Sequence, residues 1–191
     1  MYNSDHFNII INKSLNINNL SSAERDTIIS ILEYRTFKKG EILTNFGEIE
    51  RYNYIIIEGY LRMFTIKKNK EYTIDFYKEE SIASSFESRI MKQPSDYCIE
   101  ACTDGICYRI SNDVFDNNIN KIRIIEKVGR VIAEQKYIRR INKQIDLNTY
   151  SAKERYSRAL KEWPGIIDKI PQHKLATYIG IAPESLSRIK K

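Results

Sequence analysis

The residues best suited to contact another molecule lie on one side of a short predicted helix at the end of the chain. Six polar residues face outward if the apolar residues of this helix face inward: Glu184, Ser185, Ser187, Arg188, Lys190 and Lys191. Carboxylate and guanidinium groups can read the edges of DNA bases, whereas hydroxyl and ammonium groups contact phosphates. The pattern therefore indicates a surface that binds a nucleic acid.

The elements that would hold this surface are two short helices. Pro171 suits the beginning of the first helix, because its missing N–H would be unpaired there. Gly180 permits the left-handed conformation at which that helix ends, and Pro183 begins the second helix. The apolar residues that would pack between the helices are Leu175, Ala176, Ile179, Ile181, Leu186 and Ile189. This arrangement predicts a helix-turn-helix, whose second helix enters a DNA major groove; a plain helical hairpin is the alternative.

Residue combinations typical of catalysis or metal binding are not found in the sequence. Its two histidines belong to no recognisable Ser/His/Asp set, and there is no Gly-rich phosphate loop. The cysteines, Cys98, Cys102 and Cys107, are one short of the usual four ligands of an iron–sulfur cluster. We therefore predict no catalytic residue, no metal site and no cofactor, and expect the cysteines to be buried as small hydrophobic residues.

Charge is distributed unevenly over the 191 residues, which carry a net charge of +6. Residues 1–120 contain 14 basic and 18 acidic side chains, whereas residues 121–147 contain 8 and 3, and residues 148–191 contain 9 and 4. Clustered lysine and arginine attract a polyanion, so the basic second part suits DNA. A basic surface that only maintains solubility is the alternative.

The composition is that of a globular protein. Hydrophobic residues make up 42% of the chain, which is enough for a core. No apolar run approaches the roughly 20 residues that span a bilayer, and no signal peptide is recognisable, so we expect no membrane association. An odd number of cysteines without a disulfide pattern suits a reducing compartment, and we predict a cytoplasmic location.

The first 120 residues have the pattern of a small β domain. Ser21 and Glu24 form a capping box, which predicts a helix that ends near Glu33. Seven short β-rich runs follow at about ten-residue spacing, which predicts a sandwich, roll or barrel. These runs are residues 34–37, 41–44, 52–58, 61–66, 72–77, 97–102 and 105–110.

A long helix is predicted over about residues 122–145. One apolar stripe, Ile125, Val128 and Ile132, could pack on the β domain. Another has the 4-3 spacing of a two-stranded coiled coil: Ile124, Val128, Val131, Gln135, Ile138, Asn142 and Ile145. A helix of ~24 residues is ~36 Å long, which is more than one small domain covers. We therefore predict a homodimer; a helix packed only on its own domain is the alternative.

The segment after the long helix reads as a separate helical unit. Residues 146–150 are the best candidate for a hinge, and Ser151 with Glu154 forms a second capping box. Trp163, the only tryptophan, is predicted to anchor the core of this unit.

In this order of elements the chain resembles the Crp/Fnr family of bacterial transcription regulators over nearly its whole length. The residues that carry the resemblance are 39–43, Gly47, 54–59, 151–156 and 180–188. The resemblance implies an α+β fold, with an N-terminal double-stranded β-roll (a jelly roll) flanked by helices, a long dimerisation helix and a C-terminal helix-turn-helix domain. We expect these three parts at residues 1–120, 121–147 and 148–191.

The resemblance also implies a function for the terminal helices. It implies a homodimer that binds double-stranded DNA at half-sites about 34 Å apart, with RNA polymerase as a candidate partner. Glu184 and Arg188 occupy the base-reading positions of the family, and Ser185 and Ser187 would contact phosphates. Gln172 and His173 could also meet phosphates, with a solvated surface histidine as the alternative for His173. Because Ala182 replaces a capping residue and no wing follows the second helix, we expect weaker binding than in longer relatives.

The effector pocket is where the sequence departs from the cyclic-nucleotide binders of the family. These have a Gly-Glu pair for the ribose and an Arg for the phosphate, but here no Gly-Glu pair precedes the short helix, and Ser95 stands where the Arg would be. A buried phosphate without a cationic partner is costly, so we predict that cAMP does not bind with physiological affinity. A different, unidentified ligand could lie around Ser84, Ser85, Glu87, Ser95 and Tyr97, or the roll could be an empty scaffold. A ligand sensor that acts through a protein partner is the alternative to the DNA-binding regulator.

Overall fold

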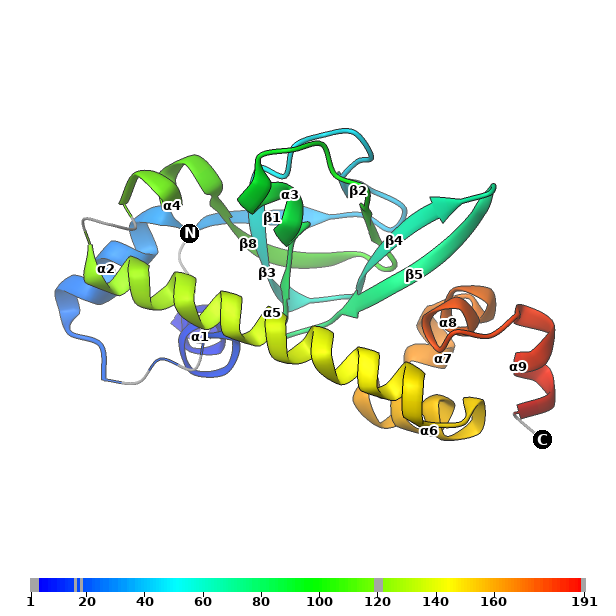
Figure 1. Cartoon of the computed structure of the whole chain (residues 1–191). Helices are drawn as coiled ribbons and strands as arrows, with labels where there is room; N and C mark the ends of the chain where they lie inside the picture. Colours follow the sequence, from blue (N-terminus) through cyan, green and yellow to red (C-terminus); the bar gives the residue numbers. More distant parts are fainter. Residues whose placement is uncertain (1–3, 16, 18, 119–121, 190–191) are drawn as a thin grey trace.

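The computed structural model describes residues 4–15, 17, 19–118 and 122–189. A β-roll occupies the middle of the molecule, the long helix α5 (Arg123–Thr149) runs along one side of it, and a helical unit lies at the far end of α5 (Figure 1). The strands are β1 (Glu33–Phe37), β2 (Ile42–Thr44), β3 (Tyr52–Glu58), β4 (Leu61–Lys67), β5 (Lys70–Tyr77), β6 (Ile82–Ala83), β7 (Cys98–Ala101) and β8 (Gly105–Ser111).

The other helices precede the roll, interrupt it or follow it. They are α1 (Ser4–Asn8), the π-helical turn η1 (Ile9–Ser14), α2 (Ser22–Ile31), α3 (Phe86–Met91), α4 (Asn112–Asn118), α6 (Ala152–Glu162), α7 (Ile166–Lys169), α8 (Gln172–Tyr178) and α9 (Pro183–Ile189). Both predicted capping boxes are present, because Ser21 and Ser151 each exchange hydrogen bonds with the glutamate three residues later. The α+β prediction with a jelly roll is confirmed.

Two four-stranded antiparallel sheets form the roll, with strand orders β1-β8-β3-β6 and β2-β7-β4-β5. Alternate residues of β3 point to opposite sides of its sheet. Tyr54 and Ile56 enter the cluster between the sheets, while Ile55 and Ile57 enter a second cluster with the helices. Burial on both sides explains why β3 is apolar along nearly its whole length. The two-residue strand β6 was not anticipated, because it is too short to show a pattern.

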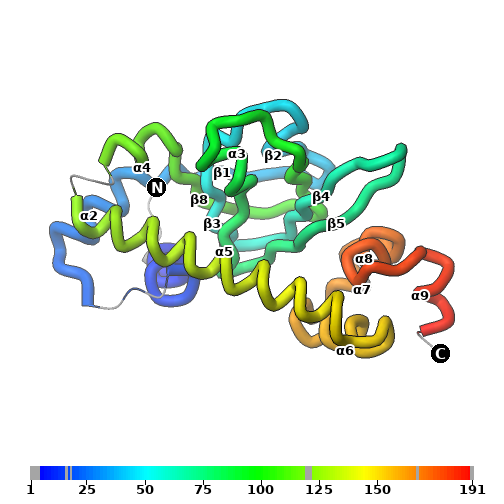
Figure 2. The backbone as a smooth tube through the Cα atoms, viewed as in Figure 1, coloured from blue at the N-terminus to red at the C-terminus, as the bar shows by residue number. Residues whose placement is uncertain are grey.

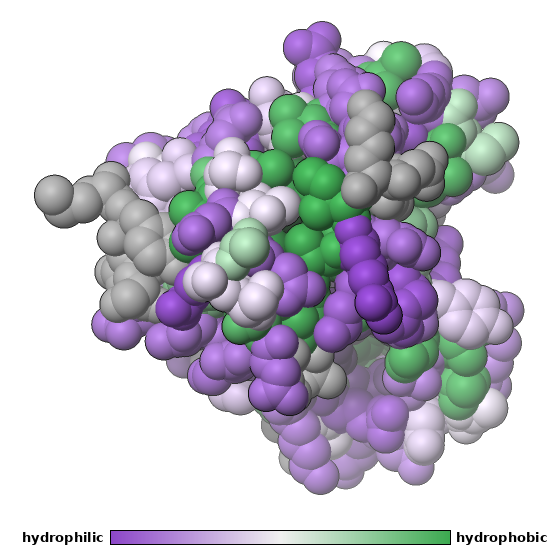
Figure 3. Space-filling model, turned by 90° about the vertical axis from the view of Figure 1, so that its left-hand side faces the viewer, coloured by the Kyte–Doolittle hydropathy of each residue, from purple (hydrophilic) through white to green (hydrophobic). Residues whose placement is uncertain are grey.

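The second cluster joins α5 to the roll. Ile125, Val128 and Ile132 are fully or almost fully buried in it, as their spacing predicted. The N-terminal residues Phe7 and Ile10 also belong to this cluster. Seen from this end of the molecule, hydrophobic side chains gather in the middle of a mostly hydrophilic surface (Figure 3).

The long helix continues through the position at which a hinge was predicted. Residues 146–149 are helical, and only Tyr150 and Ser151 separate α5 from α6. In Figure 2, α6 lies beside the end of α5. The hinge prediction for residues 146–150 is therefore wrong for its first four residues. Asp146 helps to explain the extension, since its carboxylate lies 3.0 Å from the Arg158 guanidinium of α6.

The terminal helices share one hydrophobic cluster with the edge of the roll. Trp163 is 1% exposed and lies at the centre of this cluster, as predicted. Phe76 of β5 stacks edge-on against Trp163 and also contacts the ring of Tyr178. Helices α6–α9 are therefore docked against the β-roll in this structure.

Candidate functional site

Helices α8 and α9 pack as the two helices of a helix-turn-helix. Leu175, Ala176, Ile179 and Leu186 are at most 1% exposed and form the contact between them. Gly180 has a φ of +73°, the left-handed conformation for which the turn requires glycine. The prediction of this motif from spacing is confirmed.

The polar side of α9 faces solvent. Glu184, Ser187 and Arg188 are exposed and Ser185 is half-buried, while Gln172 and His173 at the beginning of α8 are exposed. Neither Glu184 nor Arg188 forms an ion pair within the described part of the chain. Lys190 and Lys191 lie outside the described residues. The side chains predicted to read bases are thus accessible to a duplex.

Some of the basic residues counted after residue 148 are used inside the protein. Arg155 donates to the carbonyls of Tyr150 and Ile179, and Arg158 pairs with Asp146. Lys174 donates to both carboxylate oxygens of Glu100 at 2.9 and 3.0 Å. The positive charge available to a polyanion is therefore smaller than the count from the sequence.

A polar contact fixes α8 to the roll. The Thr177 hydroxyl lies 3.0 Å from the Thr73 hydroxyl of β5 and accepts the Thr73 N–H at 3.2 Å. Beside it, Glu100 accepts hydrogen bonds from Lys174 and from Arg62, whose Nη2 lies 2.7 Å from the carboxylate. Burial raises the pKa of Glu100, but the bonds from these two cations outweigh it and hold the pKa below its usual range.

Arg62 makes this contact sensitive to substitution. Its side chain is only 1% exposed, and it also donates to Glu71 at 2.7 Å. A buried guanidinium needs its carboxylate partners, since an unpaired buried charge is strongly destabilising. Sequence reasoning did not identify Arg62, because the run 61–66 shows only that an arginine occurs in a strand.

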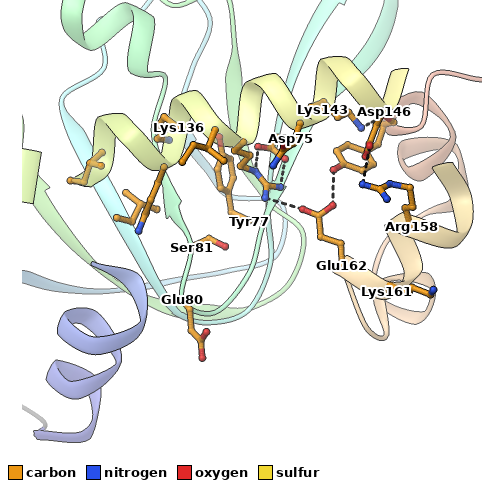
Figure 4. Close-up of a pocket in the computed structure, with 17 residues that line it drawn as sticks. Asp75, Tyr77, Glu80, Ser81, Lys136, Lys143, Asp146, Arg158, Lys161 and Glu162 are labelled. Carbon is orange, nitrogen blue, oxygen red and sulfur yellow. Dashed lines mark hydrogen bonds and ion pairs between the residues drawn. The ribbon is translucent and has the colours of Figure 1, made fainter. Parts of the chain in front are cut away.

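A groove of about 720 Å³ separates α5 and α6 on one side of the roll. Its walls carry charged side chains that mostly pair with one another (Figure 4). Arg139 donates hydrogen bonds to both carboxylate oxygens of Asp75 of β5 and donates to Glu162 of α6 at 2.9 Å. Ion pairs across this groove therefore join the roll and α5 to the terminal helices.

A second cavity of about 360 Å³ lies between α5, β5 and α3. It is lined by Ser84, Ser85, Glu87 and Tyr97, four of the five residues predicted to surround a ligand. Ser95 does not line it, and the prediction for this residue is corrected. Its buried hydroxyl lies 2.7 Å from the Ser85 hydroxyl and accepts the N–H of Tyr97, so it supports the wall.

Arg89 and Lys92 are the basic residues nearest in sequence to the position of the family's phosphate-binding arginine, and neither lines this cavity. Arg89 donates to Asn112 at 2.9 Å and to Asp116 at 2.8 Å, and so is directed to α4. The Lys92 ammonium lies 3.8 Å from the same Asp116 carboxylate. Neither residue replaces the family's phosphate-binding arginine.

A carboxylate lies behind the wall of the cavity. Glu50 is 3% exposed and accepts the Ser85 N–H at 2.8 Å and the Thr44 hydroxyl at 2.9 Å. Burial raises the pKa of Glu50 above its usual range, despite these hydrogen bonds. This glutamate fixes the turn that carries Ser84 and Ser85.

Sequence reasoning missed the cations that α5 directs into the cavity. Lys136, Arg139, Arg140 and Lys143 line it. The signal was available, since Lys136 follows Val128 and Ile132 at four-residue steps on the inner side of the helix. Burial lowers the pKa of the Lys136 amine to about 8, partly offset by Asp75 and Glu50.

The predicted dimer seam on α5 is only partly exposed. Ile124 and Val128 are buried in the protein's own core, so the prediction that they line a partner helix is corrected. Val131 is half-buried, and Gln135 donates to the Ser14 carbonyl at 2.8 Å. The remaining residues of the stripe face solvent: Ile138 is 57% exposed, Ile145 is 47% exposed, and Asn142 between them is exposed.

Three further observations concern the cysteines, metal-binding groups and membrane-spanning helices. The three cysteines are buried, and burial raises the pKa of each thiol, to about 11 for Cys98 and Cys102 and about 12 for Cys107. Among the described residues, no three histidines, cysteines or carboxylates come close enough to share a metal ion. In the same part of the chain, no helix combines the length and apolar character that crossing a bilayer requires.

Comparison with known proteins identifies the roll. Residues 34–121 match the family model of the cyclic nucleotide-binding domain. The roll is therefore similar to a cyclic nucleotide-binding domain. No curated protein sequence matches the chain.

Solved structures extend the likeness beyond this segment. FixK2 from Bradyrhizobium japonicum superposes with a TM-score of 0.70 at 14% identity, over 84% of this chain and 83% of that chain. The catabolite activator protein of Thermus thermophilus gives 0.54 at 19% identity, over 91% and 83%. The c-di-GMP responsive global regulator CLP of Xanthomonas campestris gives 0.64 at 14% identity, over 88% and 89%. The resemblance to the Crp/Fnr regulators is thus confirmed for the domain and the fold.

Proposed function

We propose that this protein is a homodimeric, sequence-specific DNA-binding transcription regulator of the Crp/Fnr type. The observation that carries the proposal is the helix-turn-helix, with the polar side of α9 exposed and Leu186 buried beneath it. Glu184 and Arg188 would read bases, since a carboxylate accepts from cytosine and a guanidinium forks onto guanine. Ser185, Ser187, Gln172 and His173 would contact phosphates, with Lys190 and Lys191 adding charge.

The proposal assigns a role to each part of the chain. Residues 1–120 would be the sensor, residues 121–147 the dimerisation helix and residues 148–191 the DNA-binding unit. It implies a cytoplasmic protein without catalytic activity, with RNA polymerase as a candidate partner. A two-fold axis along α5 would set two α9 helices about one turn of DNA apart.

The dimer would form through the exposed second half of α5. Ile138, Ile141 and Ile145 are between 39% and 57% exposed, although they are large and apolar. They recur at the three- and four-residue steps that place residues on one side of a helix. Pairing with the same stripe of a second copy would remove them from water.

Selection from a library of random DNA duplexes tests DNA binding directly. We expect the protein to enrich a two-fold symmetric site and binding to weaken steeply with salt. Arg188→Ala should lower affinity for that site at least about tenfold. Arg188→Lys is the matched control. It retains the positive charge and therefore the salt dependence of binding, but it loses the paired guanidinium hydrogen bonds to guanine and therefore the base preference. Failure to enrich any sequence, with folded protein at low salt, would overturn the proposal.

We also propose that the cavity does not bind cAMP. Arg89 donates its hydrogen bonds to α4, and the Ser95 hydroxyl is bonded within the cavity wall, so neither residue supplies the phosphate contact of the family. Calorimetric titration with cAMP should show no binding in the micromolar range. A micromolar dissociation constant would refute this part of the proposal.

A ligand sensor that acts through a protein partner is the second candidate. The observation in its favour is the docking of α8 on β5 through Thr177 and Thr73. In that case the terminal helices would be an internal contact surface, and the DNA selection would recover no preferred sequence.

A further inference from the structure

The cavity between α5, β5 and α3 has two chemically different parts. Most of its wall is apolar or aromatic, with Met63, Ile74, Tyr77, Phe86, Tyr97, Ala133 and Tyr137. Cations gather along the α5 side, where Lys136, Arg139, Arg140 and Lys143 share the lining with the carboxylates of Asp75 and Glu87. At about 360 Å³ the cavity lies at the small end of ligand pockets.

Two of these cations are already occupied. Arg139 donates hydrogen bonds to both carboxylate oxygens of Asp75. The Lys143 ammonium donates to the Tyr178 carbonyl at 2.6 Å and lies 3.0 Å from the centre of the Tyr178 ring. They contribute positive potential to the cavity, but their hydrogen bonds are used within the protein.

Lys136 is held differently. Its ammonium donates to the Ser84 carbonyl at 3.3 Å and lies 5.1 Å from the centre of the Tyr77 ring. No carboxylate lies within ion-pair distance of it among the residues that the structure describes. A partly buried ammonium with one long hydrogen bond has donors left over for an incoming acceptor.

Ser84 provides an independent sign of an absent ligand. Its side chain is 1% exposed and lines the cavity, yet its hydroxyl has no hydrogen-bond partner within the described part of the chain. Buried hydroxyls are nearly always paired, because an unpaired one keeps its full desolvation cost. Ser84 and Lys136 line the same cavity, and the Lys136 ammonium is bonded to the Ser84 carbonyl.

We propose that this cavity binds a small organic anion with a flat apolar body, and that the anion-binding charge is supplied by α5 through Lys136 and Arg140. The Ser84 hydroxyl would complete the hydrogen bonds to the anionic group, and the body would lie among Tyr77, Phe86 and Tyr137. A carboxylate, phenolate or sulfonate on an aromatic ring has this chemistry. The proposal names the effector class for the regulator proposed above, but the binding itself depends on neither DNA nor dimerisation.

The first test uses the wild-type protein and three probes. The fluorescent anion 8-anilinonaphthalene-1-sulfonate should bind saturably, and 1-naphthoate should displace it. The neutral isostere 1-naphthamide should displace it at least about tenfold less well, since it lacks the charge that the cations recognise. Equal displacement by the amide would overturn the proposal. Displacement by cAMP as effective as that by 1-naphthoate would also overturn it, because the site would then be a nucleotide site.

The second test uses matched variants of α5. Lys136→Met and Arg140→Met should each lower the affinity for the anionic probe at least about tenfold, without lowering the affinity for 1-naphthamide. Lys127→Met on the exposed side of the same helix is the control and should titrate as wild type. If either cavity variant is not folded by circular dichroism, Lys136→Gln and Arg140→Gln replace it. Unchanged affinity in both cavity variants would refute the assignment, whatever the result of the DNA selection.

Discussion

The dimer proposed for this protein can be broken by one charge at the centre of its exposed stripe. Ile138 is the most exposed isoleucine of the stripe, at 57%, and is followed by Ile145 at 47% and Ile141 at 39%. Together they would bury about one and a half isoleucine side chains per protomer, or about 3 kcal/mol. A two-fold axis doubles this to about 6 kcal/mol, and contacts elsewhere along the paired helices must supplement it, since association costs at least about 4 kcal/mol.

Ile138→Glu should therefore dissociate the dimer. It removes about 1.4 kcal/mol of burial from each protomer and places two carboxylates near the two-fold axis. A loss of about 3 kcal/mol raises the dissociation constant about 100-fold. Sedimentation equilibrium over a range of protein concentrations measures this constant directly, and circular dichroism checks that the helix remains folded.

Ile66→Glu is the control for this experiment. Ile66 is 46% exposed, but it lies near the end of β4, on the hairpin that projects away from α5 in Figure 1. It should leave the dissociation constant unchanged. The reasoning fails if Ile138→Glu is as dimeric as wild type, if both substitutions act equally, or if the wild-type protein remains monomeric at micromolar concentration.

Three further predictions concern stability, each measured as a free energy of unfolding in urea. Gly180→Ala should cost about 1–2 kcal/mol, because a left-handed φ of +73° is unfavourable for alanine. Glu100→Gln should cost about 3 kcal/mol by leaving the buried Arg62 guanidinium without its main partner. The pKa of Glu100 is lowered by folding, so this difference should be fully present above about pH 4.5 and disappear as the pH falls through the lower folded value. Lys136→Met should stabilise the protein at pH 7 by up to about 3 kcal/mol, because burial lowers the pKa of the amine to about 8. Between about pH 8 and 10.5 the Lys136 amine is largely neutral in the folded protein and still protonated in the unfolded chain. The stability of the wild type should therefore rise over this range until it matches that of Lys136→Met, whereas the difference between wild type and Lys127→Met should not change in this way.

These predictions link the cavity to the terminal helices. Asp75 lines the cavity and accepts hydrogen bonds from Arg139, which also donates to Glu162 of α6. An anion near Lys136 would compete with Asp75 for the local positive charge. The ion pairs in the groove would then connect occupancy of the cavity to the position of the terminal helices.

Local pattern was sufficient to predict most of the elements. The capping boxes at Ser21 and Ser151, the glycine at 180 and the inner stripe of α5 all act through residues within a few positions of one another. Such interactions exist in the sequence before any distant part of the chain is considered. The two helices of the helix-turn-helix were therefore placed almost to the residue.

The tertiary structure decided which sides of these elements are available. Ile124 and Ile138 both fit the heptad spacing, but only in the second half of α5 do residues of this stripe remain exposed. Lys136 and Arg62 are ordinary basic residues in the sequence and acquire their importance from burial against strands distant along the chain. Burial and pairing depend on contacts between distant segments, and one sequence carries no direct record of those contacts. The sequence by itself determined the elements and their order, and the packing of the roll, α5 and the terminal helices determined which charges can meet a ligand, a partner copy or DNA.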